Sequence, residues 1–303
     1  MNNKKHKVIV ISGTNASGKS SLGIDLALKY GGEIISADSR QIYRNFDLCC
    51  GKVTAIERAT VPHHMIDICS IGDYFSVADY QKQVYEIIPK IIERGKIPFI
   101  VGGTGLYIDA VIKGYLFENE AYSSALREEL NEKSLTELQL MLSDKARRYL
   151  GENISDFNNK RRLIRLIEKD RNGMVLFNHF CPPYDTLQIG VTWPKELLYK
   201  RIEERLEKRI RNGMIAEVKE YLDTGGNSDN LISLGLEYKY ILWYLQGNYD
   251  SIDDFSIVMS NAIKRFAKQQ MKWFKRNTDI HWIDMTQDYF IQSCKLIDQF
   301  LSI

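Results

Sequence analysis

The clearest chemical signal is a glycine-rich run near the N-terminus. Gly13 to Ser20 reads GTNASGKS and fits the pattern G-x-x-x-x-G-K-[ST]. In such a loop the backbone N–H groups converge on phosphate oxygens, Lys19 adds a point charge, and the Ser20 hydroxyl can hold Mg²⁺. We therefore expect a diphosphate or triphosphate site, the alternative being an ordinary glycine turn. The expected phosphate-binding residues are Gly13, Thr14, Asn15, Ala16, Ser17, Gly18, Lys19, Ser20 and Ser21.

A carboxylate follows the next apolar run. Asp38-Ser39-Arg40-Gln41-Ile42-Tyr43 comes directly after the short apolar segment 33–36. In a parallel sheet Asp38 would lie at the same carboxyl-end edge as the glycine loop, where ligands bind. There it can act as a metal ligand or general base, or simply cap a following helix together with Ser39.

A later strand lacks the acidic end that nucleotide hydrolases and kinases use. Such enzymes carry an acidic residue at the end of a later apolar strand to organise Mg²⁺. The candidate strand, 97–101, runs instead into Gly102-Gly103-Thr104-Gly105. This difference weighs against a nucleotide hydrolase.

Basic residues gather in three stretches, although the chain of 303 residues has a formal net charge of only +2. Arg201 and Arg205 share a helix face, but glutamates interleave with them, as on a solvated surface. The stretch 264–276 contains no acidic residue, which suits a polyanion. Its basic residues are Lys264, Arg265, Lys268, Lys272, Lys275 and Arg276, and a second cluster contains Lys160, Arg161, Arg162, Arg165, Lys169 and Arg171.

The surrounding pattern predicts an α/β fold, a P-loop NTPase-like parallel sheet flanked by helices. Strand patterns at 8–12, 33–36, 98–101 and 187–191 alternate with helical patterns at 19–30, 77–94 and 197–222. Between residues 116 and 183 the strand patterns vanish and charged helical patterns take over. We expect residues 1–115 and 184–303 to form the catalytic core, 116–183 to form a helical insertion domain, and the last third to be mostly helical.

The bulk composition is ordinary for a soluble globular protein, and we expect a cytoplasmic location from the two features that follow. None of the five cysteines lies in a CxxC pair, so we expect free thiols in a reducing compartment. No apolar run approaches the roughly 18 residues of a membrane span. The adjacent His63 and His64 have no spaced partner, so a structural or substrate-positioning role is preferred to a metal site.

Taken together, these motifs resemble the bacterial tRNA dimethylallyltransferase family, also called tRNA isopentenyltransferase. GTNASGKS, ADSRQIY, PHHMID and VGGTGLY occur in that family's order, and NNKRRLIRLIE and RIEERLEKRIRNGMIAEVKEYL resemble two later segments. The resemblance implies transfer of a dimethylallyl group from dimethylallyl diphosphate to N6 of an adenine in tRNA, at position 37 next to the anticodon. It also implies Mg²⁺ as cofactor and the tRNA anticodon stem-loop as partner of the insertion; we expect a monomer.

The resemblance also assigns roles to residues. Asp38 would be the base, Lys19, Arg205 and Arg201 would hold the diphosphate, Ser20 would hold the metal, and Thr104 would lie near the donor. The tRNA-contacting set would be Asp38, Ser39, Arg40, Gln41, Tyr43, Arg162, Arg165, Lys264, Arg265 and Lys268. Three departures from the family pattern, Asn159, Leu236 and Gln269, affect the details of RNA contact.

Three other functions remain open from the residues. An adenylate isopentenyltransferase would use the same donor with free AMP, ADP or ATP, but a mononucleotide needs neither a long insertion nor a basic helix. A small-molecule kinase would place ATP at the glycine loop. A P-loop RNA-binding protein with a decayed donor site conflicts with the intact Lys19, Ser20 and Asp38.

Overall fold

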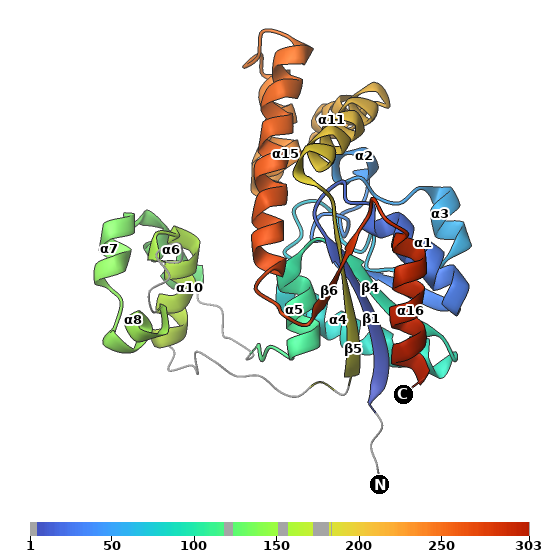
Figure 1. Cartoon of the computed structure of the whole chain (residues 1–303). Helices are drawn as coiled ribbons and strands as arrows, with labels where there is room; N and C mark the ends of the chain where they lie inside the picture. Colours follow the sequence, from blue (N-terminus) through green and yellow to red (C-terminus); the bar gives the residue numbers. More distant parts are fainter. Residues whose placement is uncertain (1–4, 118–123, 151–156, 172–181, 183, 303) are drawn as a thin grey trace. The chain divides into compact units, whose positions relative to one another are not determined.

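The computed structural model describes residues 5–117, 124–150, 157–171, 182 and 184–302. Within these residues, six parallel strands form one sheet in the order β3-β2-β4-β1-β5-β6 (Figure 1). The strands are β1 (His6–Gly13), β2 (Gly32–Ser36), β3 (His63–His64), β4 (Ile97–Gly102), β5 (Tyr184–Thr192) and β6 (Ile280–Asp284). The prediction of a parallel α/β sheet is confirmed, and β3 and β6 are additions to it.

The sheet is apolar on both faces because helices cover both. Along β1, Ile9 and Ile11 pack with Leu22 of α1 (Lys19–Tyr30), whereas Val8 and Val10 pack with Val84 of α4 (Val77–Glu93). This alternation follows from the two-residue repeat of a strand. It explains why the N-terminal run is continuously apolar.

The remaining helices of this unit precede or follow the strands. They are α2 (Asp47–Cys50), α3 (Ala55–Thr60), α5 (Gly105–Lys113), α11 (Lys195–Arg211), α12 (Met214–Asp223), α13 (Ser228–Leu234), α14 (Leu236–Leu245), α15 (Ile252–Phe274) and α16 (Tyr289–Ser302). Those from α11 to α15 contribute to an apolar core that, among the described residues, contains no strand residue. The single helix predicted over 197–222 is wrong. It is two helices, because Gly213 adopts a left-handed conformation with φ of 103° between α11 and α12.

The chain divides into two compact units, one made of residues 1–112 and 182–303 and the other of residues 113–181. The second unit contains α6 (Ser124–Glu132), α7 (Leu135–Leu140), α8 (Asp144–Leu150) and α10 (Lys160–Arg171). Leu130, Leu138 and Leu163 are part of its own small apolar core. The unit therefore has the helices and the buried apolar side chains of a separately packed insertion.

Candidate active site

The glycine loop joins β1 to α1 at the carboxyl edge of the sheet. Gly18 has a φ of 85°, and a Cβ on Gly13 would lie 2.7 Å from the Val191 side chain. Both positions therefore favour glycine. Lys19 is buried, and its Nζ donates to the Thr14 carbonyl at 3.0 Å, so its ammonium group lies over the loop.

Lys19 also lies within electrostatic reach of two other predicted site residues. Burial lowers the pKa of Lys19 to about 8, the nearby Asp38 carboxylate opposes that shift, and Arg205 adds to it. The loop, the Asp38 carboxylate after β2 and the Arg205 guanidinium from α11 thus form one charged cluster. These three groups come from positions far apart in the chain.

The ends of β2 and β4 are held together beside this cluster. The Ser39 N–H donates to Thr104 Oγ1 at 3.0 Å, and the Thr104 N–H donates to the Ala37 carbonyl at 3.0 Å. A Cβ on Gly102 would come within 2.1 Å of that carbonyl oxygen, so only glycine allows the approach. The structure therefore brings Thr104 next to the segment that carries Asp38.

The helix-capping alternative for Asp38 is wrong. No helix begins at residues 38–44; residues 39–42 form turns, and Tyr43 makes an isolated bridge to Cys69. Asp38 Oδ1 instead accepts a hydrogen bond from the Arg40 N–H at 2.9 Å and closes the first of these turns. The carboxylate is thereby fixed at the sheet edge.

The α11 arginines contact backbone carbonyls at the site. Arg201 Nε donates to the Ala16 carbonyl at 3.0 Å, and its guanidinium lies 4.3 Å from the ring centroid of Trp193. Trp193 in turn donates to the Ser17 carbonyl at 2.8 Å. Arg205 Nη2 donates to the Gly51 carbonyl at 3.2 Å. The interpretation of this face as a solvated, salt-bridged surface therefore does not hold for the two arginines.

Arg205 rests on a short helix that the sequence patterns did not predict. One carboxylate, that of Glu217, accepts from the N–H groups of all of Asp47, Leu48 and Cys49, at 2.7, 2.8 and 2.8 Å. Arg209 donates to carbonyls at the other end of the same helix, α2. These charges match the helix dipole at both ends and hold α2 in place.

Gly51, which follows α2, links two predicted site residues. Its carbonyl accepts from Arg205 and, at 3.4 Å, from Gln41 Nε2. Its φ is 60°, and an added Cβ would lie 2.1 Å from Arg205 Nη2. Nothing in the local sequence pattern marked this glycine, because its partners are distant in the chain.

A cavity of about 370 Å³ opens beside the loop. It is lined by Ala16, Ser17, Gly18, Lys19, Ser20, Ser21, Gly51, Lys52, Val53, Glu57, Arg201, Glu204, Arg205 and Lys208. Its cationic side chains and loop N–H groups suit a diphosphate.

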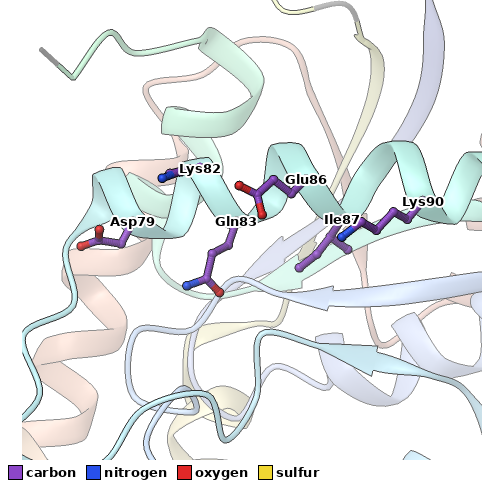
Figure 2. A pocket seen from close by; sticks show the side chains of 6 residues that line it. All are labelled: Asp79, Lys82, Gln83, Glu86, Ile87 and Lys90. Atoms are coloured by element: carbon purple, nitrogen blue, oxygen red, sulfur yellow. The ribbon is translucent and has the colours of Figure 1, made fainter. Parts of the chain in front are cut away.

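A second hollow, of about 400 Å³, lies on α4 (Figure 2). Its described lining residues are Asp79, Lys82, Gln83, Glu86, Ile87 and Lys90. The acidic and basic side chains alternate at helical spacing, as on a solvated helix face, and Asp79 is engaged in the capping box of the helix with Ser76. This hollow therefore offers no comparable chemistry.

The residues predicted to contact tRNA have different surroundings. Arg265 and Lys268 are exposed on α15, whereas Tyr43 is buried. Lys264 forms an ion pair with Glu203 of α11 at 2.5 Å and lies over the Tyr199 ring. The view that this basic stretch lacks counter-charges is therefore wrong at Lys264.

In the second unit, Arg162 and Arg165 lie on α10. Arg165 pairs with Glu168, which is also bound by Arg127. Asn159, which replaces the usual family aspartate, accepts from the Arg162 N–H at 3.2 Å and so still caps α10. This departure leaves the helix start intact.

The described residues contain no group of three His, Cys, Asp or Glu side chains able to hold a metal. His64 pairs instead with Glu33 at 2.7 Å, and His63 contacts the Val61 carbonyl. Among the described residues, no helix is both long enough and apolar enough to span a membrane. Cys49, Cys50, Cys69 and Cys294 are free thiols.

Curated proteins similar to this chain are tRNA-modifying enzymes by name. The tRNA dimethylallyltransferase of Pelotomaculum thermopropionicum is 39% identical over 289 residues, covering 93% of this chain and 91% of that protein. The tRNA dimethylallyltransferase 1 of Porphyromonas gingivalis is 41% identical over 284 residues, with 91% and 93% covered.

Solved structures and a family model agree with these relatives. The tRNA isopentenylpyrophosphate transferase of Bacillus halodurans matches with a TM-score of 0.72 and 34% identity, covering 98% of this chain and 96% of that one. A eukaryotic dimethylallyltransferase acting on tRNA shares the fold, with a TM-score of 0.77 at 22% identity, over 98% of this chain and 80% of that one. The family model described as IPP transferase matches residues 41–277. By these matches the chain belongs to the IPP transferase family.

Proposed function

We propose that the chain transfers the dimethylallyl group of dimethylallyl diphosphate to N6 of an adenine in tRNA, at position 37 next to the anticodon. The proposal rests mainly on the cluster of Lys19, Asp38 and Arg205. In this cluster the Asp38 carboxylate lies within electrostatic reach of the lysine of the glycine loop. A base and an anion site are what prenyl transfer to an amine requires. The names of the similar proteins support the same acceptor and donor.

The proposed reaction needs both the Asp38 carboxylate and the cationic groups of Lys19 and Arg205. The lone pair of an adenine amino group is delocalised into the ring, so the amine is a weak nucleophile. Its nitrogen forms a bond to C1 of the dimethylallyl group while the bond from C1 to the diphosphate oxygen breaks. Asp38 takes the N6 proton, and Lys19, Arg205 and the loop N–H groups stabilise the departing diphosphate.

The oxygen ligands at this edge fit Mg²⁺. Ser20 supplies a hydroxyl from the loop, and the described residues contain no group of three His, Cys, Asp or Glu side chains that could enclose the ion. Mg²⁺ commonly takes one or two protein oxygens and completes its shell with water and substrate phosphates. When bound, the ion would neutralise negative charge on the diphosphate. Ser20 would be its ligand from the loop.

The tRNA surface is proposed from exposed cations. Arg265 and Lys268, exposed on α15, would contact the RNA backbone. Within the second unit, the exposed Arg162 and the half-exposed Arg165, which pairs with Glu168, would also contact RNA. Near the acceptor, Ser39, Arg40 and Gln41 would position the adenine, which must leave the anticodon stack. Tyr43 is buried and would act by packing behind this segment. We place the enzyme in the cytoplasm as a monomer.

One assay tests the acceptor. Purified protein is incubated with labelled dimethylallyl diphosphate and Mg²⁺, with unmodified tRNA or AMP. We expect label in tRNA. Label in AMP would select the adenylate isopentenyltransferase. In a separate incubation with ATP, phosphorylation of a small acceptor would select a kinase.

A substitution tests the base. Asp38→Ala is expected to abolish turnover and leave tRNA binding nearly intact, because the carboxylate acts on a proton and contributes little to the RNA surface. Asp25→Ala, an exposed position on α1, serves as control and should retain activity. Full turnover by the Asp38→Ala enzyme would remove its role as base.

A further inference from the structure

Gln270 of α15 contacts two loops of the site without being one of the predicted site residues. Its Oε1 accepts from the Asn15 N–H at 2.8 Å, and its Nε2 donates to the Gly103 carbonyl at 3.0 Å. The side chain is buried, with 7% of the residue exposed. One amide group therefore connects the phosphate-binding loop to the turn that precedes Thr104.

Gly103 lies close to the Gln270 amide, which leaves little room for a side chain at this position. A Cβ there would lie 2.6 Å from Gln270 Nε2 and 3.4 Å from Lys19 Nζ. The φ of Gly103 is not in the left-handed region, so backbone conformation does not demand glycine. Glycine is favoured instead by the close approach of Gln270 Nε2, with the Gly13 carbonyl oxygen 3.3 Å away on another side.

A glutamine side chain has the hydrogen-bonding groups needed between the glycine loop and the turn that contains Gly103. The loop offers a donor and the turn offers an acceptor, and a carboxamide supplies the matching acceptor and donor at one end of one side chain. A carboxylate would place two acceptors there and face the Gly103 carbonyl without a proton. Loss of the amide would leave the buried Gly103 carbonyl and the half-buried Asn15 N–H without this partner, which is costly.

We propose that Gln270 is a positioning residue that fixes the spacing between the glycine loop and the Gly102–Thr104 turn. Thr104 in turn holds the backbone of Ser39, next to Asp38. The amide thereby sets the diphosphate site relative to the base. The part of this inference that concerns turnover rests on the proposed prenyl transfer; the part that concerns diphosphate binding does not.

The test uses the full chain with Gln270→Met, which keeps length and volume but removes both hydrogen bonds. Binding of inorganic diphosphate with Mg²⁺ is measured by calorimetry, and tRNA binding without donor is measured separately. We expect about tenfold weaker diphosphate binding, the size of a lost buried hydrogen bond, with tRNA affinity unchanged. Gln292→Met, at an exposed glutamine of α16, is the matched control and should bind diphosphate normally.

A second variant covers the case in which Gln270→Met does not fold. Gly103→Ala leaves α15 unaltered but displaces the amide, so it should weaken diphosphate binding and lower kcat as well. Unchanged diphosphate affinity in a folded Gln270→Met protein, or in Gly103→Ala when only that variant folds, would overturn the proposal. An equal loss of diphosphate affinity in the Gln292→Met control would also overturn the proposal. Label transfer to AMP instead of tRNA would defeat the proposed function and leave this result standing.

Discussion

The basic residues of α11 and α15 look alike in the sequence but have different surroundings. On α11, Arg201 donates to the Ala16 carbonyl and Arg205 to the Gly51 carbonyl, both beside the proposed diphosphate site. On α15, Arg265 and Lys268 are exposed, and the buried side of the helix contributes Gln270. The difference separates cations that would act on the reacting group from cations that would hold a long polyanion.

Among the basic residues of the two helices, Arg205 is expected to show the largest effect. Arg205→Met should lower kcat about a hundredfold, because a donor aimed at developing charge is worth most in the transition state. Binding of tRNA should be unchanged. Arg211→Met is the control on the same helix, since Arg211 is exposed and pairs only loosely with Glu207 at 3.6 Å. A comparable loss in both variants would erase the distinction between the two faces of α11.

The support beneath Arg205 should show a smaller effect. Gly51→Ala places a methyl group against the Arg205 guanidinium and should weaken diphosphate binding about tenfold. Gly95→Ala is matched in backbone, since Gly95 has a φ of 68° against 60° at Gly51, but a Cβ there meets nothing within 4 Å. Both variants carry the same left-handed strain. If they bind diphosphate equally well, Arg205 does not depend on this contact.

The pH dependence of diphosphate binding reports on Lys19. With its pKa lowered to about 8, the ammonium group loses its proton in the free protein as the pH rises through that value. Affinity should therefore fall about tenfold between pH 7 and pH 9, because the neutral amine cannot attract the anion. The reference is Lys19→Arg, whose guanidinium stays charged in this range. Parallel pH curves for the two proteins would contradict the assignment.

The smallest effect is expected on α15. Replacing Arg265 and Lys268 together by Gln should weaken tRNA binding about fivefold at moderate salt and lower the salt slope by about two. Turnover at saturating tRNA should be unchanged. Lys264→Gln should alter the slope less, because Lys264 already pairs with Glu203. A larger change from Lys264→Gln than from the double variant would reverse the assignment of this surface.

Local patterns sufficed for much of the molecule. The predicted helix 19–30 coincides with α1, and the parallel sheet follows from alternating apolar runs. The edge shared by the glycine loop and Asp38 also followed, because parallel strands end on the same side. Short-range periodicity carries this information since it reflects backbone geometry within each element.

Other features depended on the packing of distant segments. Gln270 bonds to Asn15 across 255 positions, and Arg205 bonds to Gly51 across 154. The break at Gly213 was hidden because the apolar repeat continues through it. The residues that neighbour a glutamine or a glycine in the sequence do not indicate that it will make such a long-range contact.

The sequence by itself determined the glycine-loop motif and the α/β order of the elements, because neighbouring residues specify both. Only the tertiary structure decided which cations contact the loops around the proposed diphosphate site, which carboxylate holds α2, and which glutamine joins the two loops. Hydrogen bonds between remote segments form where packing brings their atoms together. The spacing of residues along the chain does not show which segments will pack against each other.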